Sequence, residues 1–340
     1  MTNRRKIGDC EVNAIGLGCM NLSHGYGPAS DRKYAERFLN RALDIGYDCL
    51  DTATLYGDGD NERLLGAAVM HRRDEFFLAS KGVMGLVDGK RVLDGRPEAI
   101  ETQCDESLAR LNTDVIDLYY MHRLDRKVPI EESIGGLANL VQAGKIRYIG
   151  VSEVSAETLR RAHATHPVAA IQSEYSLCTR NPEISVLDTC RELGIAFVAF
   201  SPVARGFLSD RPPDPSGFHG NDIRNLLPRF RAGNYAENLA LLEAARPIAE
   251  QAGCTLPQLA LAWLLARREH VIPIPGTTSV EHLEQNFRSL EVKLAPDAVD
   301  ALASHFAPER MTGNRYPDAL QRSIDTETFE FEEYGSPQGS

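Results

Sequence analysis

Several polar residues stand where short apolar runs of the sequence end. A carboxylate at Asp51, an amine at Lys81 and an imidazole at His122 each close such a run. Side chains of these types can hold charge and exchange protons when a fold brings them together in a protected site. Taken alone, each also fits a plainer role, as a loop cap, a solvated amine or a half-buried histidine with its bonds satisfied. The distinction depends on how the preceding runs are arranged.

Eight short runs rich in β-branched residues alternate with longer amphipathic stretches, which is typical of repeated βα units and a parallel sheet. Eight units predict an α/β fold of the closed (β/α)8 TIM barrel type. Strands are predicted over residues 15–18, 48–51, 76–81, 115–121, 146–152, 168–173, 195–200 and 271–274. Helices are predicted over residues 31–45, 96–109, 129–141, 155–164, 182–193 and 236–252, and after Thr255.

Polar residues end six consecutive predicted strands, from the second to the seventh. All strands of such a barrel end at one mouth, where the active sites of these folds lie, so we expect these residues to share one site. They are Asp51, Lys81, His122, Ser152, Gln172 with Ser173, and Phe200 with Ser201.

We expect the whole chain, residues 1–340, to form one domain, since barrels of this kind reach this length around a single core. Residues 4–7 and 11–14 flank a turn-forming segment, which predicts a small hairpin that plugs the N-terminal end of the barrel. The core is expected over about residues 4–306, with extra helices before the eighth strand. Residues 307–340 are expected to form an irregular flap or a partly disordered tail.

Composition excludes several classes of partner. A net charge of −11 argues against a nucleic acid or an anionic lipid surface as partner. No apolar run approaches the length of a membrane span, and we expect a cytoplasmic protein. Seven scattered cysteines with no Cys-x-x-Cys pair predict reduced core thiols and no metal site.

Longer motifs surround the strand ends. The sequence reads GYDCLDTA from Gly46, NERLLG from Asn61, DLYYMH from Asp117, GKIRYIGVS from Gly144 and IPIPGTT from Ile272, with a Tyr-Gly pair at Tyr56. In these motifs the chain resembles the aldo-keto reductases, over about residues 4–294.

The resemblance implies a catalytic tetrad of Asp51, Tyr56, Lys81 and His122, and the reversible reduction of an aldehyde or ketone to an alcohol. Tyr56 would give a proton to the carbonyl oxygen, and Lys81 would lower the pKa of this phenol from its free value of about 10. Asp51 would keep the ammonium charged, while His122 would bind the carbonyl oxygen and orient the substrate.

No Gly-x-Gly-x-x-Gly segment follows a strand and opens a helix, so a Rossmann domain is not predicted. The resemblance implies instead an NAD(P)H cofactor extended across the barrel mouth. Ser152 and Gln172 would hold its carboxamide, Phe200 would stack on the ring, and Arg205 would pair with the pyrophosphate. The implied contacts are Gly18, Met20, Asp51, Ser152, Gln172, Phe200, Ser201, Pro202, Val203, Arg205, Gly206, Phe207, Ile274, Gly276, Thr277, Thr278, His282, Gln285 and Asn286, the last two at the adenine.

NADPH is favoured over NADH. Residues 276–279 open a predicted helix with capping-box spacing from Thr278 to Glu281, and a helix start with hydroxyls attracts an anion such as a ribose 2′-phosphate. Gly276 stands where the resembling family often has a lysine, and the next basic residue is His282. This weaker fixed charge leaves NAD(H) possible.

Two other functions fit part of the pattern. Lys81 would serve as the Schiff-base nucleophile of an aldolase-type barrel, although Asp51 beside it would keep it charged. A nucleotide-binding redox sensor or regulatory subunit with little turnover would keep the same residues. Loops 20–29, 83–95 and 204–235 and the tail after residue 307 are expected to select the small-molecule carbonyl or alcohol. Their sequences do not name it, and the oligomeric state stays open.

Overall fold

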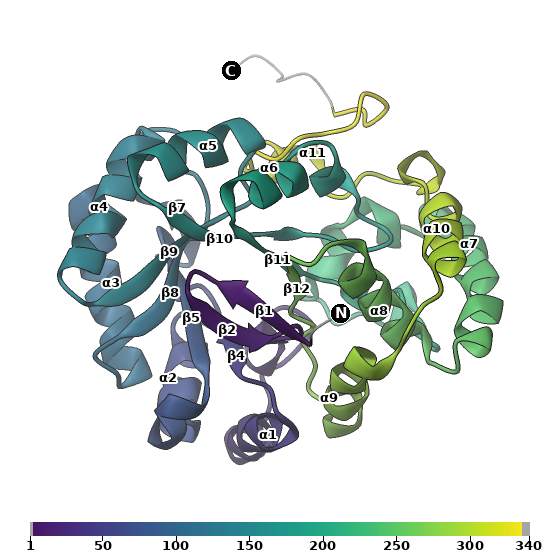
Figure 1. The fold of residues 1–340 in the computed structure, drawn as a ribbon, viewed down its shortest axis with the longest axis horizontal. Helices are drawn as coiled ribbons and strands as arrows, with labels where there is room; N and C mark the ends of the chain where they lie inside the picture. The colour runs from purple at the N-terminus through teal and green to yellow at the C-terminus, as the bar shows by residue number, and fades with distance from the viewer. Residues whose placement is uncertain (1–2, 335–340) are drawn as a thin grey trace.

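Eight parallel strands form one curved sheet in the computed structural model, which describes residues 3–334. The strand order is β12-β11-β10-β9-β8-β5-β4-β3, and helices surround the outer face of the sheet (Figure 1). The two edge strands meet where the Gly16 N–H donates to the Pro273 carbonyl at 3.0 Å. This arrangement is the predicted (β/α)8 barrel.

All eight predicted strands are present, and their bounds differ from the predicted ones by at most two residues. The strands are β3 (Leu17–Gly18), β4 (Cys49–Asp51), β5 (Phe77–Gly82), β8 (Ile116–Met121), β9 (Ile146–Ser152), β10 (Val168–Glu174), β11 (Ala196–Phe200) and β12 (Val271–Pro273).

Side chains of the barrel strands alternate between two apolar clusters, as the period of two along a strand requires. Phe77 and Ala79 belong to the cluster inside the barrel, whereas Leu78 between them belongs to the larger cluster between sheet and helices. In β8, Leu118 lies inside and Tyr119 outside in the same way. The barrel interior is therefore filled, and polar chemistry is confined to its ends.

The predicted N-terminal hairpin is present as β1 (Arg4–Ile7) and β2 (Cys10–Asn13). In Figure 1 it lies across one end of the barrel, and Ile7 and Val12 are buried in the interior cluster. Its turn needs a glycine, since Gly8 has φ +58° and a Cβ there would lie 2.4 Å from the Tyr148 ring. The hairpin closes the barrel at the end opposite to the strand carboxyl ends, as predicted.

The helices follow the predicted βα rhythm, and some of them begin at a side-chain cap. Asp31 and Ser155 accept backbone N–H bonds at the starts of α1 and α5, and Thr255 forms a capping box with Gln258 at α8. The helices are α1 (Arg32–Ile45), α2 (Asp60–Ala68), α3 (Pro97–Leu111), α4 (Ile130–Gln142), α5 (Ala156–Thr165), α6 (Val186–Leu193), α7 (Ala232–Gln251), α8 (Leu256–Arg267), α9 (Val280–Phe287), α10 (Pro296–His305) and α11 (Asp318–Gln321).

Some segments differ from the prediction. Helices α2, α10 and α11 were not among the predicted helices. The loop expected over 83–95 contains a second hairpin, β6 (Met84–Val87) and β7 (Lys90–Leu93). The helix expected over 182–193 is divided, because a 3-10 turn, Asn181–Glu183, precedes α6.

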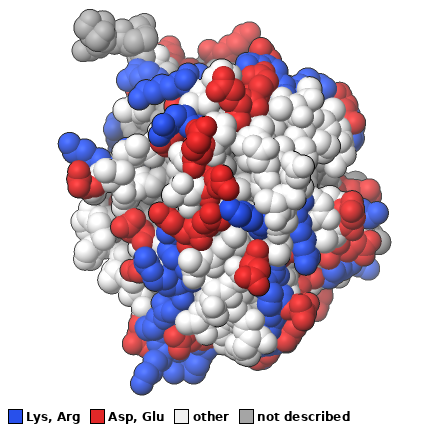
Figure 2. Space-filling model, turned by 90° about the vertical axis from the view of Figure 1, so that its left-hand side faces the viewer, with Lys and Arg blue, Asp and Glu red and all other residues white. Residues whose placement is uncertain are grey.

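The C-terminal segment is mostly irregular from residue 307 and runs across α5 and α6 (Figure 1). Residues 335–340 of the predicted tail lie outside the described residues. None of the helices described between residues 3 and 334 combines the length and the apolar composition that a membrane span needs. Acidic and basic side chains intermingle on the face drawn in Figure 2, in keeping with surface ion pairs such as Lys145–Asp105, 2.7 Å apart.

Candidate active site

The four residues of the predicted tetrad meet at the carboxyl ends of three neighbouring strands. Asp51 is the last residue of β4, Lys81 is the fifth residue of β5, and His122 directly follows β8. Tyr56 lies in the loop after β4. Asp51, Lys81 and His122 are 3%, 0% and 5% exposed, so their polar groups must be satisfied by one another or by a ligand.

Lys81 is the centre of this cluster. Its ammonium donates to the Asp51 carboxylate, to the Thr52 carbonyl at 2.8 Å and to the Tyr56 hydroxyl at 3.2 Å. The rings of Tyr56 and His122 are edge to face, with centroids 5.9 Å apart. The structure thus brings the four predicted residues into one site, with the phenol between the ammonium and the imidazole.

Burial dominates the protonation of the site. It raises the pKa of Tyr56, and the lowering effect of Lys81 only partly offsets it, so the expected net lowering is wrong. Burial by itself would lower the pKa of Lys81, but Asp51 and Tyr56 outweigh it and raise that pKa. Burial and the nearby Arg123 hold the pKa of His122 well below its usual range. At neutral pH the phenol is therefore protonated, the amine charged and the imidazole neutral.

The residues expected at the nicotinamide lie beside the tetrad. Ser152 and Gln172 are register partners on β9 and β10 and are at most 2% exposed. Gln172 Nε2 donates to Asp51 Oδ2 at 2.7 Å, which links this pair to the tetrad. Phe200 ends β11, with the Arg315 guanidinium 5.7 Å from the centre of its ring.

The loop after β11 has an unusual backbone. Ser201, Ala204 and Arg205 have φ of 50°, 49° and 59°, values that non-glycine residues rarely adopt and that cluster at functional sites. Turns of this kind can direct successive N–H groups toward an anion. Pro202 and Val203 lie within this loop, and Gly206 has φ 89°.

Two predicted contacts of this loop have partners inside the protein. The Arg205 guanidinium donates to Glu174 at 2.7 Å and to the Tyr316 hydroxyl at 3.2 Å, so a pyrophosphate would share it with a carboxylate. The Phe207 ring packs against Tyr235 in the core, with centroids 5.7 Å apart.

Three further predicted cofactor contacts, Gly18, Met20 and Gly276, lie in the segments that follow β3 and β12 or at the end of β3. A Cβ at Gly18 would lie 2.9 Å from the Ile274 oxygen, and one at Gly276 would lie 2.7 Å from Asn21 Oδ1. Close backbone packing therefore requires glycine at position 18, whereas a side chain at position 276 would first meet the side chain of Asn21. Met20, half-buried, begins the 3-10 turn that follows β3.

Helix α9 starts one residue later than the predicted capping box implies. Ser279, not Thr278, is its N-cap and accepts from the His282 N–H. Thr277 Oγ1 instead accepts from the Ser279 N–H at 3.1 Å. Thr278 and His282 are exposed, Gln285 is half-buried and Asn286 is buried.

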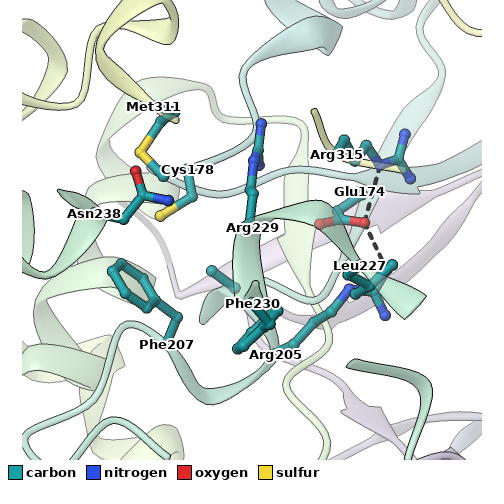
Figure 3. Close-up of a pocket in the computed structure, with 11 residues that line it drawn as sticks. Glu174, Cys178, Arg205, Phe207, Leu227, Arg229, Phe230, Asn238, Met311 and Arg315 are labelled. Atoms are coloured by element: carbon teal, nitrogen blue, oxygen red, sulfur yellow. Dashed lines mark hydrogen bonds and ion pairs between the residues drawn. The ribbon is translucent and has the colours of Figure 1, made fainter. Parts of the chain in front are cut away.

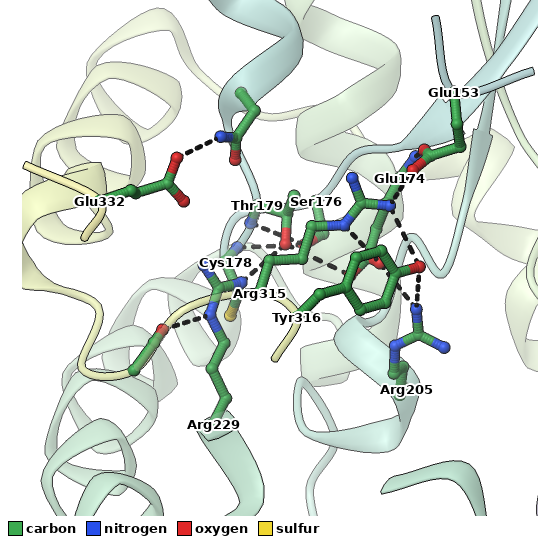
Figure 4. A network of polar contacts seen from close by, with 12 residues as sticks. Glu153, Glu174, Ser176, Cys178, Thr179, Arg205, Arg229, Arg315, Tyr316 and Glu332 are labelled. Atoms are coloured by element: carbon green, nitrogen blue, oxygen red, sulfur yellow. Dashed lines mark hydrogen bonds and ion pairs between the residues drawn. The ribbon is translucent and has the colours of Figure 1, made fainter. Parts of the chain in front are cut away.

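A buried network of charges adjoins the site and has no counterpart in the sequence analysis. Arg315 donates to Glu153 at 2.7 Å and to Glu174 at 3.0 Å (Figure 4). Burial by itself would raise the pKa of Glu174, but Arg205, Arg315 and Arg229 lower it to about 2. The carboxylates directly follow Ser152 and Ser173 at the strand ends, whereas Arg315 comes from the C-terminal segment.

A pocket borders this network. Figure 3 shows Arg205, Arg229 and Arg315 around Glu174, with apolar side chains such as Phe230 completing the wall. Its lining joins the loop after β11 to the C-terminal segment.

Within residues 3–334, no group of three or more His, Cys, Asp or Glu side chains could hold a metal ion.

Comparisons with known proteins agree with this geometry. A family model described as the aldo/keto reductase family matches residues 14–307. The NADP(+) aldo-keto reductase yakc of Schizosaccharomyces pombe is 42% identical over 331 residues, which cover 95% of this chain and 97% of that protein.

Solved structures give the same result. A glycerol dehydrogenase from Gluconobacter oxydans superposes with a TM-score of 0.81 at 27% identity, covering 90% of this chain and 96% of its own. An aldo/keto reductase from Klebsiella pneumoniae, in complex with NADP and acetate, has a TM-score of 0.71 at 27% identity and covers 93% and 99%. The chain therefore belongs to the aldo/keto reductase family.

Proposed function

We propose that the protein is an NADPH-dependent reductase of aldehydes or ketones, in which Tyr56 gives the proton. The observation that carries the proposal is the series of hydrogen bonds from Asp51 through Lys81 to Tyr56. The neutral imidazole of His122 lies edge to face with the Tyr56 ring. The relative from S. pombe is named for NADP(+), which supports the choice of cofactor.

The residues at the mouth fit a nicotinamide cofactor in their chemistry. A carboxamide needs one donor and one acceptor, which the Ser152 hydroxyl and the Gln172 amide can supply. His122 Nδ1 is buried without a hydrogen-bond partner among the described residues, as expected for a group that faces a ligand. We infer that Phe200 lies against the ring and that the loop of Ser201, Ala204 and Arg205 binds the pyrophosphate.

We propose the same extended placement for the remaining contacts. Gly18 and Met20 would border the cofactor on the β3 side, and Gly276 and Thr277 would border it on the β12 side. Thr278 and His282, both exposed, would meet the 2′-phosphate, while Gln285 and Asn286 would hold the adenine.

The charges of the tetrad suit proton transfer to a carbonyl oxygen. When bound, the reduced nicotinamide supplies a hydride to the carbonyl carbon. The raised pKa of Tyr56 keeps its proton on the phenol until negative charge develops on the substrate oxygen. Lys81 then stabilises the phenolate oxygen through the existing 3.2 Å hydrogen bond, and Asp51 keeps Lys81 charged. The neutral His122 can donate one N–H to the same substrate oxygen and so orient it.

The test is the variant Tyr56→Phe, which removes one oxygen from the site. We expect unchanged NADPH affinity and a kcat about 100- to 10,000-fold lower with a simple aldehyde such as 4-nitrobenzaldehyde, because the phenol is needed only as charge develops. NADPH consumption over many turnovers measures kcat. The matched control is Tyr119→Phe. Tyr119 is a buried tyrosine on the outer face of β8, between the sheet and the helices, so this variant should keep wild-type kcat. Unchanged kcat in Tyr56→Phe contradicts the assigned role, and tight NADPH binding by the wild type without turnover favours a redox sensor.

A further inference from the structure

Two hydrogen bonds behind the proposed carboxamide site fix the direction in which its residues donate. Arg123 Nη1 donates to Ser152 Oγ at 3.2 Å, and Gln172 Nε2 donates to Asp51 Oδ2 at 2.7 Å. Ser152 and Gln172 are register partners on neighbouring strands, so the two bonds lie behind adjacent side chains. In each bond, one of the two groups can only donate or can only accept.

The guanidinium of Arg123 can only donate hydrogen bonds. The Ser152 oxygen must therefore accept from Arg123 with one of its two lone pairs. Its one hydroxyl hydrogen is left for another partner, and because a buried hydroxyl hydrogen without an acceptor costs free energy, a ligand that accepts this hydrogen is favoured. No other partner of Ser152 Oγ occurs within residues 3–334. Arg123 Nη1 is also fixed by the His122 carbonyl at 2.6 Å, and no carboxylate of the described chain pairs with this guanidinium. Ion pairing therefore does not account for its position.

The Asp51 carboxylate, bonded to the Lys81 ammonium, can only accept. The Gln172 amide must present its nitrogen to Asp51, and this determines the orientation of the whole amide group. Its oxygen is left as the free acceptor. The Tyr120 hydroxyl lies close to the same amide, but an amide oxygen has two lone pairs, so one stays available.

We propose that Arg123 and Asp51 are positioning residues that make Ser152 a donor and Gln172 an acceptor, so that the nicotinamide carboxamide binds in one orientation. The carboxamide oxygen faces Ser152 on β9, and its NH2 group faces Gln172 on β10. The reversed carboxamide would place two donors together on one side and two acceptors on the other. The inference rests on the proposed function, because it concerns the same cofactor site.

A double-mutant cycle tests whether Arg123 acts through Ser152. NADPH is titrated, without substrate, into wild type, Arg123→Met, Ser152→Ala and the double variant, and Kd is read from NADPH fluorescence. Each single variant should weaken binding about fivefold, the worth of one neutral hydrogen bond. The double variant should be no weaker than Ser152→Ala alone. Arg123→Lys, which keeps a pure donor, should stay within about twofold of wild type. Arg126→Met, in the same loop, is the matched control and should leave Kd unchanged.

A cofactor analogue tests the direction of the bonds. The 3-acetylpyridine analogue of NADPH replaces the carboxamide NH2 with a methyl group and keeps the oxygen. Arg123→Met should weaken binding of this analogue by the same factor as binding of NADPH, since the contact at the oxygen is unchanged. Gln172→Leu should weaken NADPH about fivefold and leave affinity for the analogue unchanged, since its methyl group cannot donate.

The outcomes separate this inference from the proposed function. Additive losses in the double variant would show that Arg123 does not act through Ser152, and equal losses of both cofactors in Gln172→Leu would show that the amide has the opposite direction. Either result overturns the inference. If Arg123→Met does not fold, Ser152→Ala and Gln172→Leu with the two cofactors still decide the direction. Failure of the proposed function would appear separately, as a wild type that does not bind NADPH or does not turn over.

Discussion

Replacing Asp51 with asparagine should leave the buried ammonium of Lys81 without its counter-charge. Lys81 is fully buried, and its other two partners, the Thr52 carbonyl and the Tyr56 hydroxyl, are neutral. Breaking a buried ion pair by removing one partner costs about 3–5 kcal/mol. The asparagine oxygen can still accept a hydrogen bond, so we expect about 3 kcal/mol at pH 7. For a chain of 340 residues, this corresponds to a Tm lower by about 4 °C.

The loss in Asp51→Asn should depend on pH with a defined sign. In the wild type the pKa of Lys81 is raised above 10.5, so the pair contributes stability at neutral pH that disappears as pH rises through the folded-state pKa. In Asp51→Asn, burial is no longer opposed by a carboxylate and lowers that pKa below 10.5. The stability deficit relative to wild type should therefore be largest near pH 7 and shrink above pH 10.5.

Urea unfolding of the cofactor-free protein across this pH range measures the effect. Asp125→Asn is the matched control: Asp125 is 5% exposed, and it accepts backbone N–H bonds from Gly95 and Lys127. This variant also loses a buried carboxylate but leaves no buried cation unpaired. A deficit in Asp51→Asn below about 1 kcal/mol, or one that stays constant from pH 7 to pH 11, would refute the electrostatic reasoning.

Three further outcomes are expected. Arg315→Ala leaves the buried Glu153 without a cationic partner and Glu174 with Arg205 alone. Urea unfolding should therefore show a loss of about 3–5 kcal/mol at pH 7, and almost none for an exposed arginine. The pKa of Glu174 is lowered from 4.5 to about 2, so its contribution of about 3 kcal/mol is present above pH 4.5 and lost as pH falls toward 2; circular dichroism during acid titration should show a weaker pH dependence in Glu174→Gln. Trp263→Ala empties a fully buried site and should cost about 3–5 kcal/mol in unfolding while kcat stays at the wild-type value, which a large fall in kcat would contradict.

The barrel could be predicted because its strands are rich in β-branched residues, and most of these residues are buried in the folded sheet. Runs such as residues 146–152 are β-branched and buried, and their bounds match those of β9. Helix α2 was not predictable in this way, because it has only nine residues. Its N-cap, Gly59, has φ 82° and offers no side chain to cap the helix. The hairpin of β6 and β7 was read as a loop, because a pair of short exposed strands has no core-facing pattern.

The catalytic residues of the candidate site could be predicted because they lie in recognisable sequence motifs. Tyr56 and Lys81 are recognisable from short segments of sequence, and the structure places them 3.2 Å apart. The direction of the Tyr56 pKa shift could not be predicted from the sequence, because desolvation depends on every atom packed around the phenol. Arg315 was also beyond reach, since it lies 162 residues from Glu153 and 141 from Glu174, and no spacing rule connects them.

The position of Arg315 has a consequence for how the chain matures. Synthesis runs from the N-terminus, and the last barrel strand is complete at Pro273. Until residue 315 follows, Glu153 and Glu174 are two adjacent negative charges at the rim of the nascent barrel, without the guanidinium that bridges them. Water should therefore hydrate these two carboxylates at first. It should leave them only when the C-terminal segment has been synthesised and packs against the barrel.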